Sequence, residues 1–160
     1  MLLEVLDWRS SPFPGNMPTE LAVALGGRVV EELVYGKEEI TTGASGDLQQ
    51  VRNIARRMVA QWGFAKETIG AIAWEGPDGN GGIGPQGASL ETESAIDEQV
   101  KMLVSEAYDH CMKTLSDNRQ LVEELTELLL EKETVDYKEL KEMVRKYNPS
   151  MAGELNPALV

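Results

Sequence analysis

The chain has 160 residues, enough for one domain with a sizeable core, and 27 acidic against 15 basic residues give it a net charge of -12. This balance argues against binding to nucleic acid or to anionic lipid, because both need basic surfaces. The single cysteine, Cys111, cannot form an internal disulfide, and no apolar run approaches the roughly 20 residues of a membrane-spanning helix. The N-terminus runs straight into Glu4 and Asp7, unlike a signal peptide, so we expect neither a targeting nor a membrane segment in this chain.

Residues 1–18 are predicted to form an extended, Pro-rich arm, because prolines at this density break helices. A first helix is predicted from Thr19 to Gly36, with apolar residues every fourth position at Leu21, Leu25, Val29 and Leu33. Two glycines in its middle, Gly26 and Gly27, each cost about 1 kcal/mol relative to alanine. They indicate that another backbone packs closely there, the alternative being a tolerated weak point.

A second helix is predicted from about Ser45 to Trp62, with Gly63 ending it. Asp47 lies in its first turn, where the helix dipole favours negative charge. One face carries five apolar residues: Leu48, Val51, Ala55, Met58 and Trp62. The wetter side carries Arg52, Arg56 and Arg57, which we expect to be solvated or paired with carboxylates.

Residues 69–74 are short and apolar and are a candidate strand, followed by a Gly-rich loop from Gly76 to Gly87. Residues 79–84 formally fit the G-x-G-x-x-G pattern of dinucleotide sites. We reject that interpretation, because Pro85 and Gly87 follow where a helix should begin. A surface loop is the expected structure.

From Ser89 onward the pattern is helical again. A long amphipathic helix is predicted from its stripe of apolar residues, Ile96, Val100, Leu103, Ala107, Cys111 and Leu115. A further helix restarts at Ser116 or Asp117 and carries Leu121, Leu125, Leu128 and Leu129. Asp136 and Glu139 fit a capping box for a last helix, which ends at Asn148 and Pro149 and carries Leu140, Met143, Val144 and Tyr147.

Three segments carry a resemblance to a known family. Residues 41–50, TTGASGDLQQ, resemble a segment of FtsH-type ATP-dependent zinc metalloproteases in which the matching aspartate is the third zinc ligand. Residues 22–32, AVALGGRVVEE, and residues 129–136, LLEKETVD, resemble two more segments of that family, in the same order and at matching separations. The chain is therefore similar, over about residues 21–146, to the C-terminal part of an FtsH-type peptidase domain, most like plastid and cyanobacterial members.

The resemblance implies that Asp47 is a zinc ligand. From the residues alone, Asp47 is expected to be an ordinary helix-end carboxylate, since a hydrolytic zinc site needs three protein ligands. The family's other ligands come from a His-Glu-x-x-His helix, a motif that this sequence does not contain. Its one histidine, His110, follows Asp47 where the family's histidines precede the aspartate, so we expect a packing or rim histidine; Cys111 is expected to be a small buried hydrophobe.

Glu31 and Glu32 end the first helix in the pattern G-G-R-x-x-E-E. In the family this helix lies near the metal centre, so the resemblance makes each of them a candidate for orienting a metal-binding imidazole. The alternative is a solvated helix face.

Taken together, we expect a mainly α, incomplete FtsH-type peptidase domain over residues 19–147. It would comprise a helical pair at 19–63 that includes Asp47, a Gly-rich connection at 64–88 with at most a short strand, and a helical bundle at 89–147. The arm at 1–18 and a flexible tail at 148–160 would flank it.

Two functions follow as expectations. In the first, the chain is a fragment or truncated relative of an ATP-dependent zinc metalloendopeptidase of membrane-protein quality control. In the second, it is a non-catalytic helical module that packs with full-length FtsH-type subunits. The resemblance implies zinc, ATP only through a module that this sequence lacks, a hexameric ring, protein substrates and a plastid (thylakoid) location. We expect the isolated chain to be inactive and to self-associate or be partly molten, because apolar faces that the family's first helices cover would be exposed.

Overall fold

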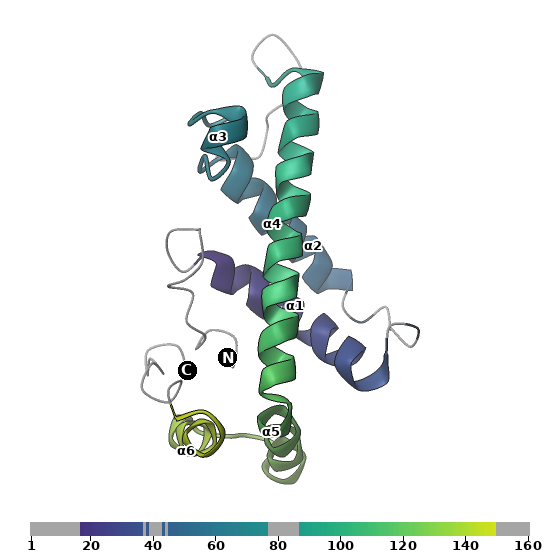
Figure 1. The fold of residues 1–160 in the computed structure, drawn as a ribbon, viewed down its shortest axis with the longest axis vertical. Coiled ribbons are helices and arrows are strands. Elements are labelled where there is room, and N and C mark those ends of the chain that lie inside the picture. The colour runs from purple at the N-terminus through teal and green to yellow at the C-terminus, as the bar shows by residue number, and fades with distance from the viewer. Residues whose placement is uncertain (1–16, 37, 39–42, 44, 77–86, 150–160) are drawn as a thin grey trace.

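The computed structural model describes residues 17–36, 38, 43, 45–76 and 87–149. These residues form six helices: α1 (Met17–Tyr35), α2 (Ser45–Ala60), α3 (Lys66–Ile69), α4 (Leu90–Asp117), α5 (Arg119–Lys132) and α6 (Tyr137–Tyr147). They contain no strand, so the mainly α fold predicted from the sequence is confirmed. In Figure 1, α4 runs along the long axis of the molecule, α1 and α2 cross behind it, and α5 and α6 lie at its C-terminal end.

The main core lies where α1, α2 and α4 cross. Each helix contributes side chains with almost no exposure to solvent, among them Leu21 and Leu25 of α1, Met58 of α2, and Ile96 and Cys111 of α4. Burying a leucine or methionine side chain contributes about 2 kcal/mol, so this crossing is the principal source of stability.

Helix α1 begins at Met17, two residues before the predicted start at Thr19. Pro18 therefore lies in the first helical turn, where the missing N–H of proline costs no hydrogen bond. At the other end, Gly36 has a φ of 86°, a conformation that favours glycine, and its N–H donates to the carbonyl of Glu32 at 3.0 Å. The predicted end of α1 is confirmed, and the remainder of the predicted arm, residues 1–16, lies outside the described residues.

Helix α2 is shorter than predicted and its apolar face is only partly buried. It ends at Ala60, so Trp62 lies in the following turn and Gly63, with a φ of 70°, ends that turn. Val51, Ala55 and Met58 are buried as expected. Leu48 and Trp62 are instead 45% and 44% exposed, because Leu48 borders an open groove and Trp62 leaves the helix axis to pack beside the ring of Phe64.

The candidate strand at residues 69–74 is wrong. Ile69 ends the four-residue helix α3, and residues 70–74 are irregular. The N–H groups of Trp74 and Glu75 both donate to the carbonyl of Ala60, at 2.8 and 3.2 Å. The segment is thus held by the end of α2 and needs no neighbouring strand. Most of the Gly-rich loop that follows, including residues 79–84, lies outside the described residues.

Helix α4 has the predicted start and stripe. The Ser89 hydroxyl caps it by accepting a hydrogen bond from the N–H of Thr92 at 3.2 Å. Of the predicted stripe, Val100 is half-buried, and the others are buried in the main core: Ile96, Leu103, Ala107, Cys111 and Leu115. The helix continues through Asp117, so the break falls at Asn118, one or two residues after the predicted restart.

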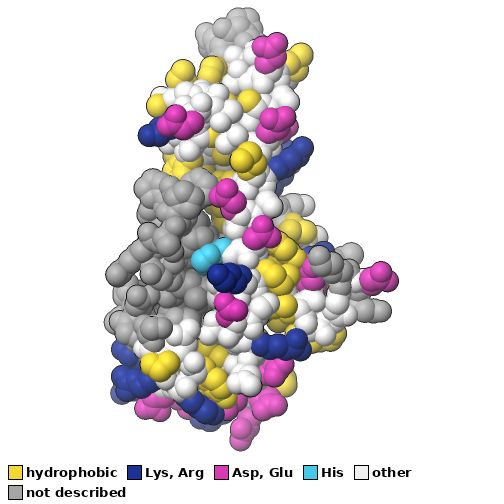
Figure 2. All heavy atoms as spheres, in the orientation of Figure 1, with side chains coloured by type: hydrophobic (Ala, Val, Ile, Leu, Met, Phe, Trp, Pro, Cys, Tyr) yellow, Lys and Arg dark blue, Asp and Glu magenta, His cyan; other side chains and the backbone are white. Residues whose placement is uncertain are grey.

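Helices α5 and α6 form a hairpin with a second, smaller core of Leu121, Leu140 and Val144. The predicted capping box of α6 is confirmed: the Asp136 carboxylate accepts from the N–H of Glu139 at 2.8 Å, and Glu139 accepts from the N–H of Asp136 at 3.3 Å. Helix α6 ends at Tyr147, as predicted. Charged side chains of both signs gather over this end of the molecule in Figure 2.

None of the helices that the structure describes combines the length and the apolar character needed to cross a membrane.

Candidate functional site

Asp47 is the third residue of α2 and is exposed, next to the middle of α1. A Cβ atom placed on Gly27 of α1 would lie 3.7 Å from Asp47 Oδ2, an ordinary contact distance. The two glycines in the middle of α1 predicted another backbone in close contact. The neighbour of Gly27 is instead this side-chain carboxylate, at a distance that would also leave room for a Cβ atom. The crossing of α1 and α2 thus places Asp47 beside Gly27.

The described residues do not form a metal site by themselves. Among residues 17–36, 38, 43, 45–76 and 87–149, no three side chains of histidine, cysteine, aspartate or glutamate gather closely enough to hold a metal ion. A hydrolytic zinc site takes three protein ligands. A zinc site that includes Asp47 would therefore need at least one ligand from outside this set.

Glu31 and Glu32 take different positions at the end of α1. Glu31 is one helical turn beyond Gly27, on the same face of the helix as the contact with Asp47. Glu32 accepts a hydrogen bond from the hydroxyl of Tyr108 on α4. Burial of Tyr108, followed by this hydrogen bond and the charge of Glu32, raises the pKa of its hydroxyl to about 12. Glu32 therefore joins α1 to α4, and Glu31 is the one nearer to Asp47 along the helix face.

Of the three arginines on α2, Arg56 is engaged in an ion-pair cluster. Its Nε lies 2.6 Å from Glu75 Oε1, and its Nη2 lies 2.7 Å from Glu93 Oε2. Glu75 is only 8% exposed. Burial lowers the pKa of Arg56, but the hydrogen bonds and charges of the two glutamates outweigh burial and raise it overall. The cluster ties α2 and the 70–76 segment to the start of α4.

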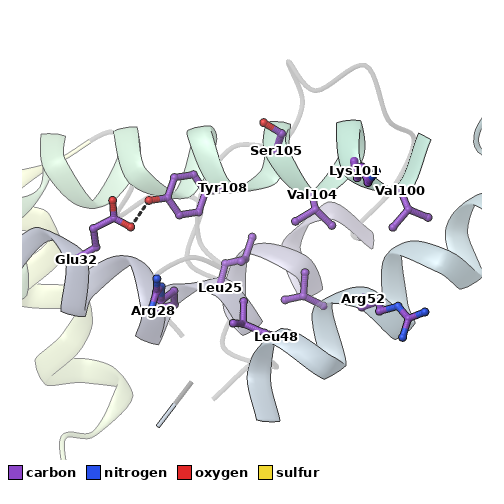
Figure 3. Close-up of a pocket in the computed structure, with 11 residues that line it drawn as sticks. Leu25, Arg28, Glu32, Leu48, Arg52, Val100, Lys101, Val104, Ser105 and Tyr108 are labelled. Atoms are coloured by element: carbon purple, nitrogen blue, oxygen red, sulfur yellow. Dashed lines mark hydrogen bonds between the residues drawn. The ribbon is translucent and has the colours of Figure 1, made fainter. Parts of the chain in front are cut away.

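An open groove of about 640 Å³ lies between α1, α2 and α4 (Figure 3). Its apolar lining comes from all three helices: Leu25, Leu48, Val51, Val100 and Val104. Its polar side chains are Arg28, Glu32, Arg52, Lys101, Ser105 and Tyr108. The groove has the volume of a small-ligand or side-chain site. It adjoins the Asp47 contact, because Leu48 and Arg28 directly follow Asp47 and Gly27 in the chain.

His110 is half-buried and the neighbouring Cys111 is fully buried on α4, so His110 lies at the rim of the core, one of its expected positions. Burial, with a smaller contribution from the charge of Lys113, lowers the pKa of His110. Cys111 is fully buried, as predicted, with its Sγ 3.7 Å from the carbonyl oxygen of Ala22, and burial raises the pKa of its thiol to about 12. A thiol with this pKa stays protonated at neutral pH and is a poor nucleophile or metal ligand.

Sequence reasoning did not identify the groove or the roles of Tyr108 and Glu75. A partial signal was present in Leu48, an apolar residue in the polar first turn of α2, which indicates an apolar neighbour. Nothing in the spacing of α4 distinguishes Tyr108 from an ordinary half-buried tyrosine, because its partner lies 76 positions away.

Comparison with known proteins gives the family. A family model described as Peptidase family M41 matches residues 14–143. "ATP-dependent zinc metalloprotease FtsH 3" of Synechocystis sp. is 43% identical over 141 residues, which is 85% of this chain and 23% of that protein. "ATP-dependent zinc metalloprotease FTSH 1, chloroplastic" of Oryza sativa subsp. japonica is 42% identical over 128 residues, covering 77% of this chain and 18% of the relative.

A third relative, "ATP-dependent zinc metalloprotease FtsH" of Chloroflexus aggregans, is 41% identical over 147 residues, or 86% of this chain and 22% of the relative. The predicted resemblance to cyanobacterial and chloroplast proteins of this kind is confirmed. The chain spans only about a fifth of the length of the curated relatives that it matches.

Proposed function

The chain belongs to peptidase family M41, and on this basis we propose that it forms part of the peptidase domain of an FtsH-type ATP-dependent zinc metalloendopeptidase. In this proposal Asp47 supplies one of the zinc ligands. The other ligands, from a His-Glu-x-x-His helix, and the ATPase activity would come from parts that this sequence does not contain. The protein acts on polypeptide substrates within an oligomer of FtsH-type subunits, and its chloroplast relatives support a plastid location.

The contact between Asp47 and Gly27 is the observation that carries the proposal. The carboxylate is exposed, and the backbone that carries it is positioned by the crossing of α2 with α1, where Oδ2 would lie 3.7 Å from a Cβ atom on Gly27. A metal ligand needs both properties: accessibility to ligands from other segments, and a fixed position. Glu31, one turn further along the same face of α1, is proposed to orient a ligand that comes from elsewhere. Glu32 is the second candidate for this role, although Tyr108 already engages its carboxylate.

A non-catalytic assembly module is the alternative. It is favoured by the lack of a three-residue metal cluster among the described residues, together with several large apolar side chains that are exposed on the helices. Leu130 is 80% exposed, and Tyr35 is 66% exposed. Such side chains suit packing against further protein.

The first test is zinc calorimetry of the 160-residue chain with a casein-cleavage assay. We expect neither tight binding nor cleavage, because the described residues offer no complete site. Tight one-to-one binding that Asp47→Ala abolishes, together with cleavage, would show instead that the chain is an autonomous enzyme.

The second test transplants residues 14–143 into the Synechocystis relative, in place of its matching segment. We expect this chimera to bind zinc and to degrade casein with ATP. Asp47→Asn should lose zinc and cleavage while assembly and ATP hydrolysis persist. Glu91→Gln is the matched control, since Glu91 is also an exposed first-turn carboxylate, on α4. Cleavage unchanged by Asp47→Asn would refute the proposed ligand, and a chimera that assembles and hydrolyses ATP without binding zinc would favour the assembly module.

A further inference from the structure

We propose that the groove between α1, α2 and α4 binds a short extended segment of a polypeptide, with apolar side chains on the groove floor and carboxylates at its two ends. The proposal gives the proposed peptidase a substrate class. Its physical basis, however, is the groove itself and requires no metal.

The floor of the groove is suited to apolar side chains. Leu25 and Val51 are almost fully buried beneath it, and Val100 and Val104 of α4 are half-buried along one wall. Leu48 stands at the opposite wall and is 45% exposed. Covering these surfaces with an apolar ligand would remove them from water, which favours binding. In Figure 2 a strip of hydrophobic side chains reaches the surface beside the middle of α4.

Three cations surround this floor: Arg28, Arg52 and Lys101. In the part of the chain that the structure describes, none of the three forms an ion pair, although the whole chain has 27 acidic residues. Glu32 is the one carboxylate in the lining, and it accepts the hydrogen bond of Tyr108. The groove therefore presents positive charge on a strongly acidic protein, and this charge complements an anionic ligand.

The positions of the cations favour a peptide over a lipid-like anion. In Figure 3, Arg28 lies towards the end closed by Glu32 and Tyr108, whereas Arg52 and Lys101 lie at the opposite end. The stretch of α4 from Val100 to Tyr108 rises about 12 Å, which an extended peptide covers with about four residues. A fatty acid has its single carboxylate at one end and would leave the cations of the other end without a partner.

The location of the groove connects it to the proposed peptidase. Its walls include Leu48 and Arg28, the residues that directly follow the Asp47 and Gly27 contact pair. A segment held in the groove would therefore pass beside the proposed zinc ligand. Arg28, Arg52 and Lys101 would then select substrate segments with carboxylates on either side of apolar residues.

The experiment measures fluorescence anisotropy of labelled, acetylated tetrapeptides with the full 160-residue chain. The probe is Glu-Leu-Val-Glu, and the matched peptides are Lys-Leu-Val-Lys and Glu-Ser-Ser-Glu. We expect both matched peptides to bind at least about tenfold more weakly, and we expect added salt to weaken binding of the probe. Arg52→Glu and Lys101→Glu should each weaken binding of the probe about tenfold. Arg57→Glu, an equal change of charge at an exposed position of the same helix, should not.

Circular dichroism and urea unfolding verify that each variant is folded. Equal affinities of the chain and of Arg52→Glu for the probe, or no binding at all, would overturn the proposal. Binding of sodium dodecanoate in place of the peptide, with the same dependence on Arg52, would identify a lipid-like ligand instead. A dimer that Arg52→Glu dissociates in sedimentation experiments would identify a second copy of the chain as the occupant.

The same variants separate this inference from the proposed function. Asp47→Ala should still bind the probe, because the groove does not include its side chain. In the chimera, Arg52→Glu should keep zinc. If the chain does not bind the probe but the chimera binds zinc, the groove proposal alone fails. If the chain binds the probe but the chimera does not bind zinc, the proposed function alone fails.

Discussion

The hydroxyl of Tyr108 on α4 donates a hydrogen bond to the carboxylate of Glu32 on α1, and so joins the two longest helices of the main core. The phenol is half-buried beside a negative charge, and its pKa rises from the ordinary value of 10.0 to about 12. Because the folded state favours the protonated phenol, this contribution to stability is complete below the unfolded pKa and is lost as the pH rises towards the folded one.

Tyr108→Phe should therefore lower the free energy of unfolding by about 1 kcal/mol at neutral pH. It should also remove the phenol with a pKa of about 12 from a spectrophotometric titration. Tyr35→Phe is the control, because Tyr35 is 66% exposed. Equal effects of the two substitutions on urea unfolding would show that the Glu32 bond contributes nothing.

Arg56→Lys should lower the free energy of unfolding by about 2 kcal/mol, because an ammonium group cannot reach Glu75 and Glu93 with the fixed fork of a guanidinium. Glu75 is nearly buried, so its carboxylate would be left poorly compensated. Arg57→Lys, at the next and exposed position, should change little. Urea unfolding monitored by tryptophan fluorescence measures the free energy of unfolding of both variants. An unchanged free energy for Arg56→Lys would mean that water stabilises the Glu75 carboxylate as well as the guanidinium does.

His110 should make the fold less stable in mild acid. Burial lowers its pKa below the ordinary 6.5, so the unfolded chain binds the proton more readily than the folded chain. The contribution is complete above pH 6.5 and is lost as the pH falls through and below that value. Stability curves against pH for the chain and for His110→Gln should diverge across this window. Lys113→Gln should reduce the divergence, since the Lys113 charge adds to the shift, and parallel curves would contradict the assignment to His110.

Leu140→Ala should loosen the α5–α6 hairpin by about 3 kcal/mol, because Leu140 is fully buried in the second core. Hydrogen exchange should become faster in α5 and α6, while the amides of α1, α2 and the first half of α4 keep their protection. Leu130→Ala, at an 80% exposed position of α5, should change neither region. Uniform loss of protection along the chain would show that the two cores unfold as one.

The sequence predicts the helices well where local pattern decides the structure. The stripe of α4, the capping box of α6 and the glycine that ends α1 are properties of neighbouring residues, and the structure confirms them. The errors lie where tertiary contacts decide. The carbonyl of Ala60 accepts hydrogen bonds from the N–H groups of Trp74 and Glu75, so this segment needs no partner strand. Trp62 lies beyond the end of α2 and packs beside Phe64. Neither contact has a signature in periodicity.

The candidate site was predictable only in part. Asp47 stood out because its segment resembles a family in which the matching aspartate binds zinc, whereas its local pattern describes any helix-end carboxylate. The contact with Gly27 depends on how two helices cross, and the groove depends on three helices. A single sequence specifies the faces of such helices but not the angle or offset at which they meet.

Asn118, the one residue between α4 and α5, determines the direction of everything that follows it. Its side chain donates to the carbonyl of Thr114 at 2.9 Å and accepts from Asn148, at the end of α6, at 3.4 Å. Asn118 thus links the end of α4 to the end of α6, and these two hydrogen bonds hold the α5–α6 hairpin against the C-terminal end of α4. One residue added at the junction between α4 and α5 would turn α5 by about 100° about its axis, directing its leucines away from α6. The number of residues at this junction thus determines the packing of α5 against α6 as much as any side chain does.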